Sequence, residues 1–583
     1  MRLRSTIVCA TLFGALALVP AASAKGTAYV VGGNAAGEAA PFSIAAGGEL
    51  TALTKAPAGG TPRSVAITPN SQFLYASFLG AGNPGISGYS ISQAGTLTPL
   101  AGVSPLLLGA GNAPEGLAIS PNGQVLYVAQ QGSNSIAALA IGADGGLTPI
   151  GTTPVAGFGQ GSIAVAPNGQ LLYATTAAGV VSFTIGANGG LSAAGGPFPA
   201  GTGPRGIAIA PNGNSLYVSN NGSNNVTAFS VGADGALTSL GNSPTGITPA
   251  TVAVSQNGAF VYITAPGSDN VSAYAIGADG ALTAVPGQPF SAAPGDETFG
   301  LDAAPGSQFV YATNRVTANT TAFSVGADGA LSQIAGSPFP TGVVNPEFQS
   351  IAITPNQGPT ALFTGGVVGR SDRGGGGQTA EFNASSSSDS DGGSIAAYTW
   401  DFGDGSAPET TASPTISHTY TAAGDFQVTL TVTDDQGCSN QQLFTGQTAD
   451  CNGSGSARMT QTVQVSATDT APNLKLKGKK QELAKKVTVT AKTTDDTDAV
   501  AKGKLRIEKK SGKSQSYKLK KAKKSLVGGE KTKIKPKLRK KAYNKAKKVL
   551  KNGGKVTAKV NVKVTDADDD TDKDSVKVKL TKP

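Results

Sequence analysis

A ten-residue segment recurs seven times between residues 43 and 334 and constrains the fold more than any other feature of this chain. The clearest copy is VGADGALTSL at 231–240, and IGADGALTAV at 276–285 differs from it at few positions. Successive copies are 44 to 50 residues apart, which indicates a repeat architecture. The central glycines of the copies are Gly48, Gly95, Gly145, Gly189, Gly235, Gly280 and Gly329.

Two further segments share this period. An apolar segment that ends in a turn, such as GIAIAPNG at 206–213, and a tyrosine segment, such as LYVS at 216–219, each occur seven times. With one strand on each side of the Gly-Ala-Asp-Gly segment, every repeat supplies about four short strands. The fold class is therefore predicted to be all-β, with a seven-bladed β-propeller over about residues 25–357.

The two ends of the repeat region are complementary. The region begins with a tyrosine segment at 28–31 and ends with an apolar segment at 350–356. We therefore expect one blade to combine both ends of the region, which would close the ring and leave no open sheet edge. A solenoid is the alternative architecture, and it would not need complementary ends.

The repeated aspartate has a structural and a functional interpretation. Asp hydrogen-bonds its own backbone in turns and Gly supplies a positive φ, so the segment is expected to be a hairpin turn. Calcium binding is the alternative, but one carboxylate in each turn cannot supply the about six to eight oxygen ligands that Ca²⁺ takes. The aspartates concerned are Asp144, Asp234, Asp279 and Asp328.

These repeats resemble the lactonase-type seven-bladed propellers, which include the bacterial 6-phosphogluconolactonases, and the surface-layer YVTN repeat proteins. The resemblance implies the fold and leaves the activity open, because propellers support many functions.

A second resemblance covers residues 358–466. WDFGDG at 400–405 and HTYTAAGDFQVTLTV at 418–432 are similar to the PKD domain, an immunoglobulin-like β-sandwich of bacterial surface proteins and exported enzymes. Trp400 is expected in the core and His418 in a structural role. The glycine-rich segment 364–377 is expected to be a flexible loop.

The N-terminus has the pattern of a secretory signal peptide at 1–24. Arg2 and Arg4 precede an apolar run at 7–19, and AASA predicts cleavage after Ala24. An uncleaved anchor is the alternative, and no later stretch is predicted to cross a membrane. Export to the cell surface or medium predicts that Cys438 and Cys451 form a disulfide that closes an insertion in the PKD domain. Free thiols or a metal site are the alternatives, although further soft ligands are lacking nearby.

The C-terminal region, residues 473–583, is strongly basic. It holds 36 Lys and Arg against 12 Asp and Glu, whereas residues 25–472 hold 8 against 24. VTAKVNVKV and SVKVKL alternate apolar residues with lysine, which predicts a small lysine-coated β-sandwich with a helix or turn at 542–554. A disordered basic tail is the alternative.

Lysines as solvated point charges suit envelope polyanions or acidic glycans, although they could also serve solubility alone. A nucleic-acid partner is not expected, because Tyr517 and Tyr543 are the region's only aromatic residues and the chain is predicted to be exported.

Candidate ligand-binding residues precede the apolar strands, which we expect to be innermost and to begin at one mouth of the central channel. Two arginines at equivalent blade positions could clamp a carboxylate or phosphate, and a glutamate could act as general base. A ring of paired charges at a solvated mouth is the alternative. The candidates are Arg63, Glu115, Gln160, Arg205, Glu297 and Glu347, and Ala250 is expected to line the mouth at the same blade position.

The sequence indicates no cofactor. Asp401 and Asp404 are the candidates for a calcium site in the PKD domain, with a turn role as the other interpretation. We predict an exported binding or adhesion protein that recognises carbohydrate, cell wall or protein without catalysis. The alternative is a secreted lactonase-like hydrolase of sugar lactones that uses Arg63, Glu115 and Arg205.

Overall fold

The computed structural model describes residues 26–33, 36–80, 83–292, 295–369, 378–465, 474–493, 497–565 and 571–583. The expected signal peptide lies outside these residues. The chain divides into two compact units: the repeat region with the PKD region, and the lysine-rich C-terminal region. No helix in the described ranges is long and apolar enough to cross a membrane.

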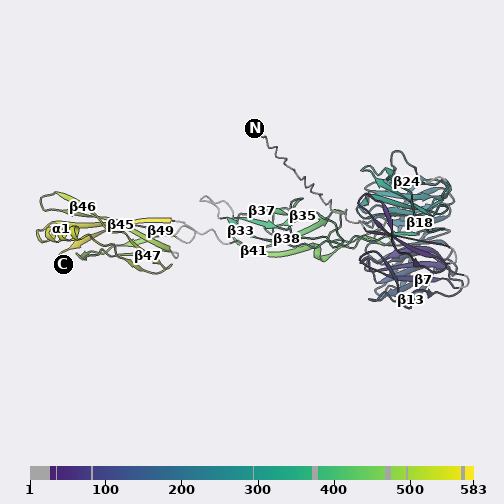
Figure 1. Ribbon diagram of the computed structural model, residues 1–583, viewed down its shortest axis with the longest axis horizontal. Coiled ribbons are helices and arrows are strands. Elements are labelled where there is room, and N and C mark those ends of the chain that lie inside the picture. The colour runs from purple at the N-terminus through teal and green to yellow at the C-terminus, as the bar shows by residue number, and fades with distance from the viewer. Residues whose placement is uncertain are drawn as a thin grey trace, which may run out of the picture. The chain divides into compact units, whose positions relative to one another are not determined.

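The repeats form seven antiparallel sheets of four main strands each, so the predicted seven-bladed propeller is confirmed (Figure 1). The apolar segments are the innermost strands, and neighbouring blades contact one another through them. The innermost strands are β32 (Ile351–Ile353), β5 (Thr61–Ile67), β10 (Pro114–Ile119), β14 (Phe158–Val165), β18 (Pro204–Ile209), β22 (Val252–Val254) and β27 (Thr298–Ala303).

The remaining blade strands follow outward in chain order. The tyrosine strands are β1 (Thr27–Gly32), β6 (Phe73–Leu79), β11 (Val125–Gln130), β15 (Leu171–Thr176), β19 (Ser215–Asn220), β23 (Phe260–Ala265) and β28 (Phe309–Asn314). The third strands are β2 (Glu38–Ile44), β7 (Gly85–Ile91), β12 (Ser135–Ile141), β16 (Gly179–Ile185), β20 (Asn225–Val231), β24 (Asn270–Ile276) and β29 (Asn319–Val325). The outer strands are β3 (Leu50–Ala52), β8 (Leu97–Pro99), β13 (Leu147–Pro154), β17 (Leu191–Phe198), β21 (Leu237–Pro244), β25 (Leu282–Ala284) and β30 (Leu331–Gln333), with short additions at β4 (Ala56–Pro57), β9 (Leu106–Leu107), β26 (Phe290–Ser291) and β31 (Phe339–Pro340).

One blade is built from both ends of the repeat region, as predicted. β1 pairs with β2 on one side and with β32 on the other, with Tyr29 opposite Ala352. The first and last repeats are thus hydrogen-bonded in one sheet, which closes the ring.

The repeated segment bends the chain and also receives a hydrogen bond from the preceding blade. In the turn, Asp144 Oδ1 accepts the N–H of Gly146 at 3.0 Å, as expected for a hairpin. The buried hydroxyl of Tyr75 donates to the carbonyl of Gly145 in the next blade at 2.8 Å. Tyr311 repeats this contact across the ring closure, at 2.9 Å from the carbonyl oxygen of Gly48. The tyrosine and the turn therefore form one inter-blade contact.

The PKD region is a two-sheet sandwich. Its sheets have the orders β33-β34-β37 and β36-β35-β38-β41, with a small hairpin, β39-β40, in the insertion. Trp400 is fully buried in a cluster of aromatic rings, as predicted. The strands are β33 (Thr364–Gly369), β34 (Gln378–Asn383), β35 (Ile395–Asp401), β36 (Glu409–Thr411), β37 (Thr415–Tyr420), β38 (Gly424–Asp434), β39 (Leu443–Phe444), β40 (Ala449–Cys451) and β41 (Arg458–Val465).

The expectation of a flexible loop over 364–377 was wrong for its first part. Residues 364–369 form β33, which pairs with β34 along Thr364 to Gly369. The backbone supplies the ladder hydrogen bonds, so glycine weakens a strand without preventing it. Residues 370–377 lie outside the described part of the chain.

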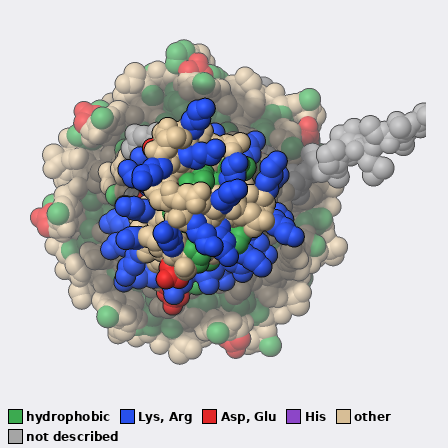
Figure 2. Space-filling model, turned by 90° about the vertical axis from the view of Figure 1, so that its left-hand side faces the viewer, with side chains coloured by type: hydrophobic (Ala, Val, Ile, Leu, Met, Phe, Trp, Pro, Cys, Tyr) green, Lys and Arg blue, Asp and Glu red, His purple; other side chains and the backbone are tan. Residues whose placement is uncertain are grey.

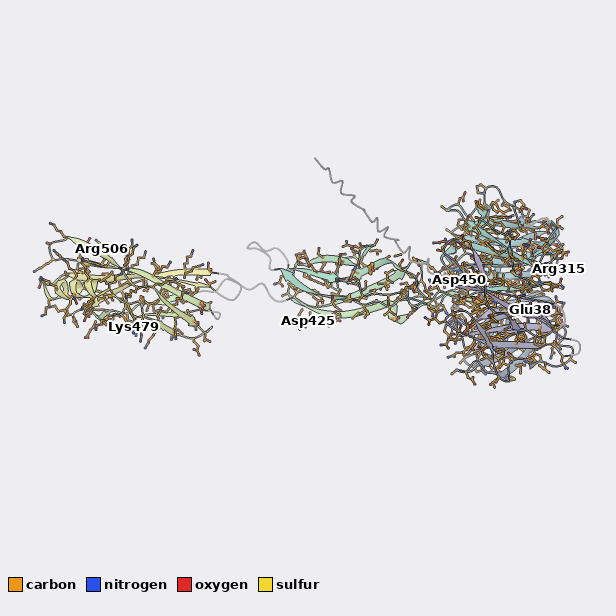
Figure 3. All side chains as sticks on the ribbon, viewed as in Figure 1. Glu38, Arg315, Asp425, Asp450, Lys479 and Arg506 are labelled. Atoms are coloured by element: carbon orange, nitrogen blue, oxygen red, sulfur yellow. A yellow bond between two sulfur atoms is a disulfide. The ribbon has the colours of Figure 1, made fainter. Side chains whose placement is uncertain are left out.

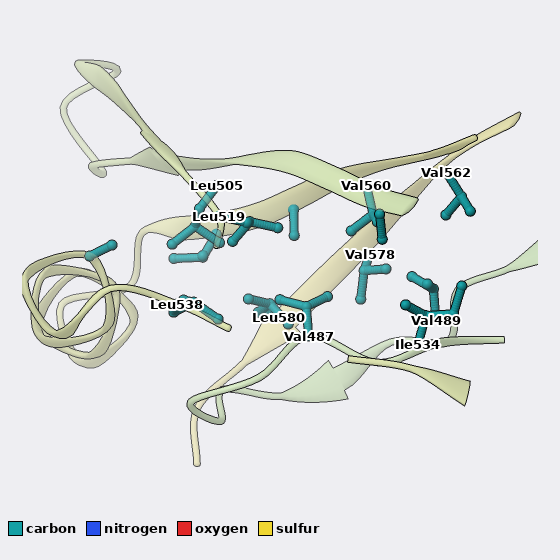
Figure 4. Close-up of a cluster of buried hydrophobic side chains, with 14 of the residues drawn as sticks. Val487, Val489, Leu505, Leu519, Ile534, Leu538, Val560, Val562, Val578 and Leu580 are labelled. Carbon is teal, nitrogen blue, oxygen red and sulfur yellow. The ribbon is translucent and has the colours of Figure 1, made fainter. Parts of the chain in front are cut away.

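The C-terminal region folds around its own core of Val, Leu, Ile and Ala side chains, which face one another between two sheets (Figure 4). Helix α1 (Lys540–Lys551) packs against β45 and β49. The three-stranded sheet is β42 (Lys475–Lys477), β44 (Val489–Lys492) and β48 (Thr532–Ile534). The larger sheet contains β43 (Gln481–Glu482), β50 (Thr571–Thr581), β49 (Lys555–Thr565), β45 (Thr497–Glu508), β46 (Ser514–Lys518) and β47 (Ala522–Leu526).

Candidate functional site

The predicted site residues lie at or just before the start of the innermost strands, and three of them lie in β-bulges. The pairing of β5 with β6 shifts register between Pro62 and Ser64, on either side of Arg63. The corresponding shifts in β10 and β18 contain Glu115 and Arg205. A bulge leaves a residue out of the ladder and re-aims its side chain. The repeated bulge thus directs one side chain from each of these strands to the same end of the channel, which we call the mouth.

Four of the predicted residues meet there in an ion-pair network. Arg63 lies 3.2 Å from Glu347 and 3.7 Å from Glu115. Glu347 also lies 3.7 Å from Arg315, which in turn contacts Glu297. Glu347 therefore bridges two arginines that are 252 positions apart in the sequence.

Among the described residues Arg205 forms no ion pair, in contrast to Arg63 and Arg315, although Arg315 shares the Phe299 ring with it at 4.9 Å. The guanidinium carbon of Arg205 lies 5.1 Å from the ring centre of Phe299 and 5.3 Å from that of Phe348. Its buried Nε has no hydrogen-bond partner among the described residues. Burial lowers the pKa of Arg205 to about 10, so the side chain remains charged at neutral pH. The mouth thus contains a buried cation held by aromatic faces.

Glu115 is the most perturbed acid of the network. Burial raises the pKa of this carboxyl, and the nearby charges of Arg63 and Arg205 oppose that shift. Its side chain is only 12% exposed. A carboxylate with a raised pKa beside arginines is equipped to exchange a proton with a bound molecule.

Some site residues depart from the prediction or were missed by it. Ala250 is buried and packs with Phe299 and Phe348, so it is part of the wall. The side chain of Gln160 lies outside the described residues. Arg315 and the two phenylalanines were missed. Each phenylalanine follows a glutamate of the network within two residues, in ETF at 297–299 and in EF at 347–348, which is a signal that could have been used.

Gln349 forms the floor beneath the mouth. Its backbone carbonyl accepts the N–H of Val65 at 3.1 Å, and its side-chain oxygen accepts the hydroxyl of Ser64 at 3.3 Å. Its amide nitrogen donates to the hydroxyl of Ser162 at 3.4 Å. One side chain therefore connects the innermost strands of separate blades across the channel.

The opposite end of the channel is covered by the insertion of the PKD domain, which the disulfide Cys438–Cys451 closes as predicted. The carbonyls of Thr445, Gly446 and Gln447 accept, in turn, the N–H groups of three innermost strands. The donors are Ile209 at 3.0 Å, Val165 at 2.8 Å and Ile119 at 3.0 Å. We call residues 443–451 the plug.

Side chains of the plug add to this docking. Gln447 Nε2 donates to the carbonyls of Ile163 at 2.9 Å and Ile207 at 2.8 Å. Gly446 has a φ of +125°, and a Cβ there would lie 2.9 Å from that of Ala164. Asp450 lies on the PKD side of the propeller and Arg315 on its far side (Figure 3). The mouth and the plug therefore occupy opposite ends.

Two buried carboxyls interact where the plug docks, Asp302 of the propeller and Asp450 of the plug. Asp302 lies on β27 and accepts the N–H groups of Ile353 and Ala303, each at 2.9 Å. Burial raises its pKa to about 7. Burial and the neighbouring Asp302 raise the pKa of Asp450 well above its ordinary value. Asp302 was missed, although the six other blades have alanine at its position, namely Ala66, Ala118, Ala164, Ala208, Ala253 and Ala352.

The candidate calcium residues of the PKD domain are used in turns. Asp401 accepts the N–H of Gly403, and Asp404 accepts that of Ser406, each at 3.0 Å. Asp404 also lies 2.8 Å from Nε2 of His418, whose ring stacks on a core phenylalanine. No cluster of three or more His, Cys, Asp or Glu suited to a metal occurs among the described residues.

Comparison with known families agrees with this architecture. The family model "Lactonase, 7-bladed beta-propeller" matches residues 83–195 and 184–299, and the PKD domain model matches residues 366–448. The chain carries a lactonase-type seven-bladed propeller and a PKD domain. These two domains make up its first compact unit.

Solved structures resemble the lactonase-type propeller at low identity. A putative 6-phosphogluconolactonase of Bacteroides fragilis is 21% identical, with a TM-score of 0.49 over 57% of this chain and 98% of its own. The periplasmic gluconolactonase PpgL of Pseudomonas aeruginosa is 19% identical, with a TM-score of 0.48 over 56% of this chain and 99% of its own.

A curated relative matches a short stretch of the chain. The pre-pro-metalloprotease PrtV of Vibrio cholerae is 46% identical over 87 residues, which are 15% of this chain. The match spans only 8% of the length of that protein.

Proposed function

We propose that the lactonase-type propeller binds a small anionic sugar lactone at its mouth and hydrolyses it. The observation that carries this proposal is the Arg205 guanidinium, which lies buried beside Phe299 and Phe348 with an Nε that has no hydrogen-bond partner among the described residues. A buried guanidinium with an unpartnered N–H favours a ligand that offers an anionic hydrogen-bond acceptor. The lactonase family match supports the reaction class.

Glu115 and the arginines have separate roles in this proposal. Ionised Glu115 takes a proton from water, whose oxygen bonds to the lactone carbonyl carbon. The ring C–O bond then breaks, and the released oxygen takes a proton to give a hydroxy acid. Arg205 holds the ligand's phosphate or carboxylate, and Arg63 stabilises the charge that develops on the carbonyl oxygen.

Hydrolysis of gluconolactone and 6-phosphogluconolactone tests the proposal, with the spontaneous rate subtracted. We expect Arg205→Gln to lower kcat/KM for 6-phosphogluconolactone by roughly 10- to 100-fold, since hydrogen bonds to charged groups contribute about 1.5–3 kcal/mol, and to affect the neutral gluconolactone much less. Glu115→Gln should lower kcat. Arg458→Gln is the matched control, because it removes one positive charge from an exposed position of the PKD domain. Hydrolysis no faster than the spontaneous rate would remove the enzyme interpretation, and saturable binding without turnover would leave a recognition module.

A separate observation favours a second function. The C-terminal domain has a net charge of +24, and Lys and Arg side chains cover the face of it seen in Figure 2. We propose that the protein is exported and that this domain attaches it to a polyanionic part of the cell envelope.

Retention on isolated cell walls tests the attachment. The chain without its signal peptide should be retained at low salt and released by about 0.5 M salt, because salt screens exposed charges. A truncation that ends at residue 465 should pass through. Equal retention of both forms would contradict the proposal.

A further inference from the structure

The solvent face of the large C-terminal sheet contains a row of lysines that lie directly opposite one another on four neighbouring strands. Lys504 on β45 is paired with Lys518 on β46 and with Lys559 on β49. Lys559 is in turn paired with Lys577 on β50. All four side chains are exposed. We call these four residues the lysine row.

Such a row is electrostatically unfavourable in the protein alone. Like charges directly opposite on neighbouring strands destabilise a sheet, and the row contains three such pairs in succession. Among the described residues of this sheet, the one ion pair within the 4.0 Å limit joins Arg506 to Glu508, at 3.9 Å, outside the row. Solubility alone does not require lysines to be opposite one another, because dispersed lysines provide it equally well.

The spacing of the row defines the ligand that would neutralise it. Neighbouring strands lie about 4.8 Å apart, so the row presents one positive charge at about that interval across the strands. A linear polymer with one negative charge in each unit of similar length would place its charges opposite the lysines. Lysine ammonium groups are flexible point charges, which tolerate small differences in the repeat.

We propose that the lysine row is the binding track for a linear acidic glycan that lies across the strands. This inference rests on the proposed envelope attachment and assigns it to one surface. The row contains no aromatic side chain, and Tyr517 occupies the neighbouring position to Lys518, opposite buried Leu505. The surface therefore lacks the stacking platform that single-stranded nucleic acids use.

The experiment compares two variants of the full chain that lose the same charge. In the row variant Lys504, Lys518, Lys559 and Lys577 are all changed to Gln. In the control variant the same change is made at Lys509, Lys510, Lys545 and Lys548, which cluster in a hollow beside α1. Titration with a soluble polyuronate at low salt measures the affinity, and titration with duplex DNA at equal charge concentration provides the comparison.

We expect the row variant to bind the polyuronate about 10- to 100-fold more weakly, and the control variant to lose much less. The polyuronate should also raise the melting temperature of the parent protein's C-terminal domain more than that of the row variant.

The failures of the two proposals are distinguishable. Equal losses in both variants would show that net charge alone binds the polymer, which overturns the row and leaves the attachment. No binding of the parent protein to cell walls or polyuronate at low salt would overturn both proposals. Tighter binding to DNA than to the polyuronate would overturn the glycan assignment.

Discussion

Replacing Gln447 with alanine should loosen the plug from the propeller. Its amide nitrogen donates to two carbonyls, those of Ile163 and Ile207, which belong to neighbouring innermost strands. Each intramolecular hydrogen bond contributes about 1 kcal/mol, so the variant should lose about 2 kcal/mol of docking free energy. That loss corresponds to a roughly 30-fold larger population of the undocked state.

Hydrogen exchange measures this population directly. The N–H groups of Ile119, Val165 and Ile209 donate to plug carbonyls, so each becomes available to solvent only when the plug opens. Their exchange in Gln447→Ala should be about 30-fold faster, while amides of the outer strands keep their rates. Gln441→Ala is the control, because that side chain is exposed at the base of the same insertion. Equal exchange of the three amides in both variants would refute the reasoning that the side chain of Gln447 holds the plug.

Three further perturbations have defined outcomes. Changing Cys438 and Cys451 to Ser should speed hydrogen exchange of the same three amides, because a disulfide that closes a loop of this size contributes about 3 kcal/mol of stability. Unchanged exchange rates would mean that the hydrogen bonds alone order the plug. Plug protection should also fall as pH rises from about 4 to about 7, because burial raises the folded pKa of Asp302 to about 7 and that of Asp450 well above its ordinary value, so that their contributions are complete below the unfolded values. Asp450→Asn removes one of these two groups and should flatten the dependence; a profile identical to the parent's would contradict it. Tyr311→Phe should lower the free energy of unfolding by about 1 kcal/mol, because it removes the hydrogen bond to the carbonyl of Gly48. Tyr173→Phe should leave this free energy unchanged, because the hydroxyl of Tyr173 has no partner among the described residues. Equal effects of the two changes would argue against the inter-blade contact.

The propeller could be predicted in detail because its information is local and repeated. Each repeat contains the same strand patterns and the same turn, so the seven copies determine the number of blades. The complementary ends of the repeat region determine how the ring is closed. The position of the mouth could be predicted as well, because Arg63, Glu115 and Arg205 occupy equivalent positions before the apolar segment that recurs in each repeat. A residue's position in a repeat was sufficient to place it at one end of the channel.

The partners within the mouth could not be predicted in the same way. Arg315 follows a tyrosine strand instead of preceding an innermost strand, and the loop that carries Glu297 brings the two together. Arg205 and Phe299 come from different blades, so their stacking depends on the diameter and curvature of the ring. These contacts are properties of the closed structure and have no local signature.

The plug was the least predictable feature, because three of its hydrogen bonds to the propeller use backbone carbonyls, which every residue has. Its side-chain signals include Phe444, which is buried among propeller core residues, and Gly446 and Gln447, while the propeller contributes the aspartate that replaces alanine at position 302. The plug and Asp302 together occupy the N–H groups of four innermost strands at one end of the channel, those of Ile119, Val165, Ile209 and Ile353. Since backbone groups that are already paired are not free to bind a ligand, these four N–H groups are not available to one at that end of the channel. The insertion of the PKD domain is therefore a structural part of the propeller's channel. Mutations in this insertion should change the stability of the propeller more than they change the surface of the PKD sandwich.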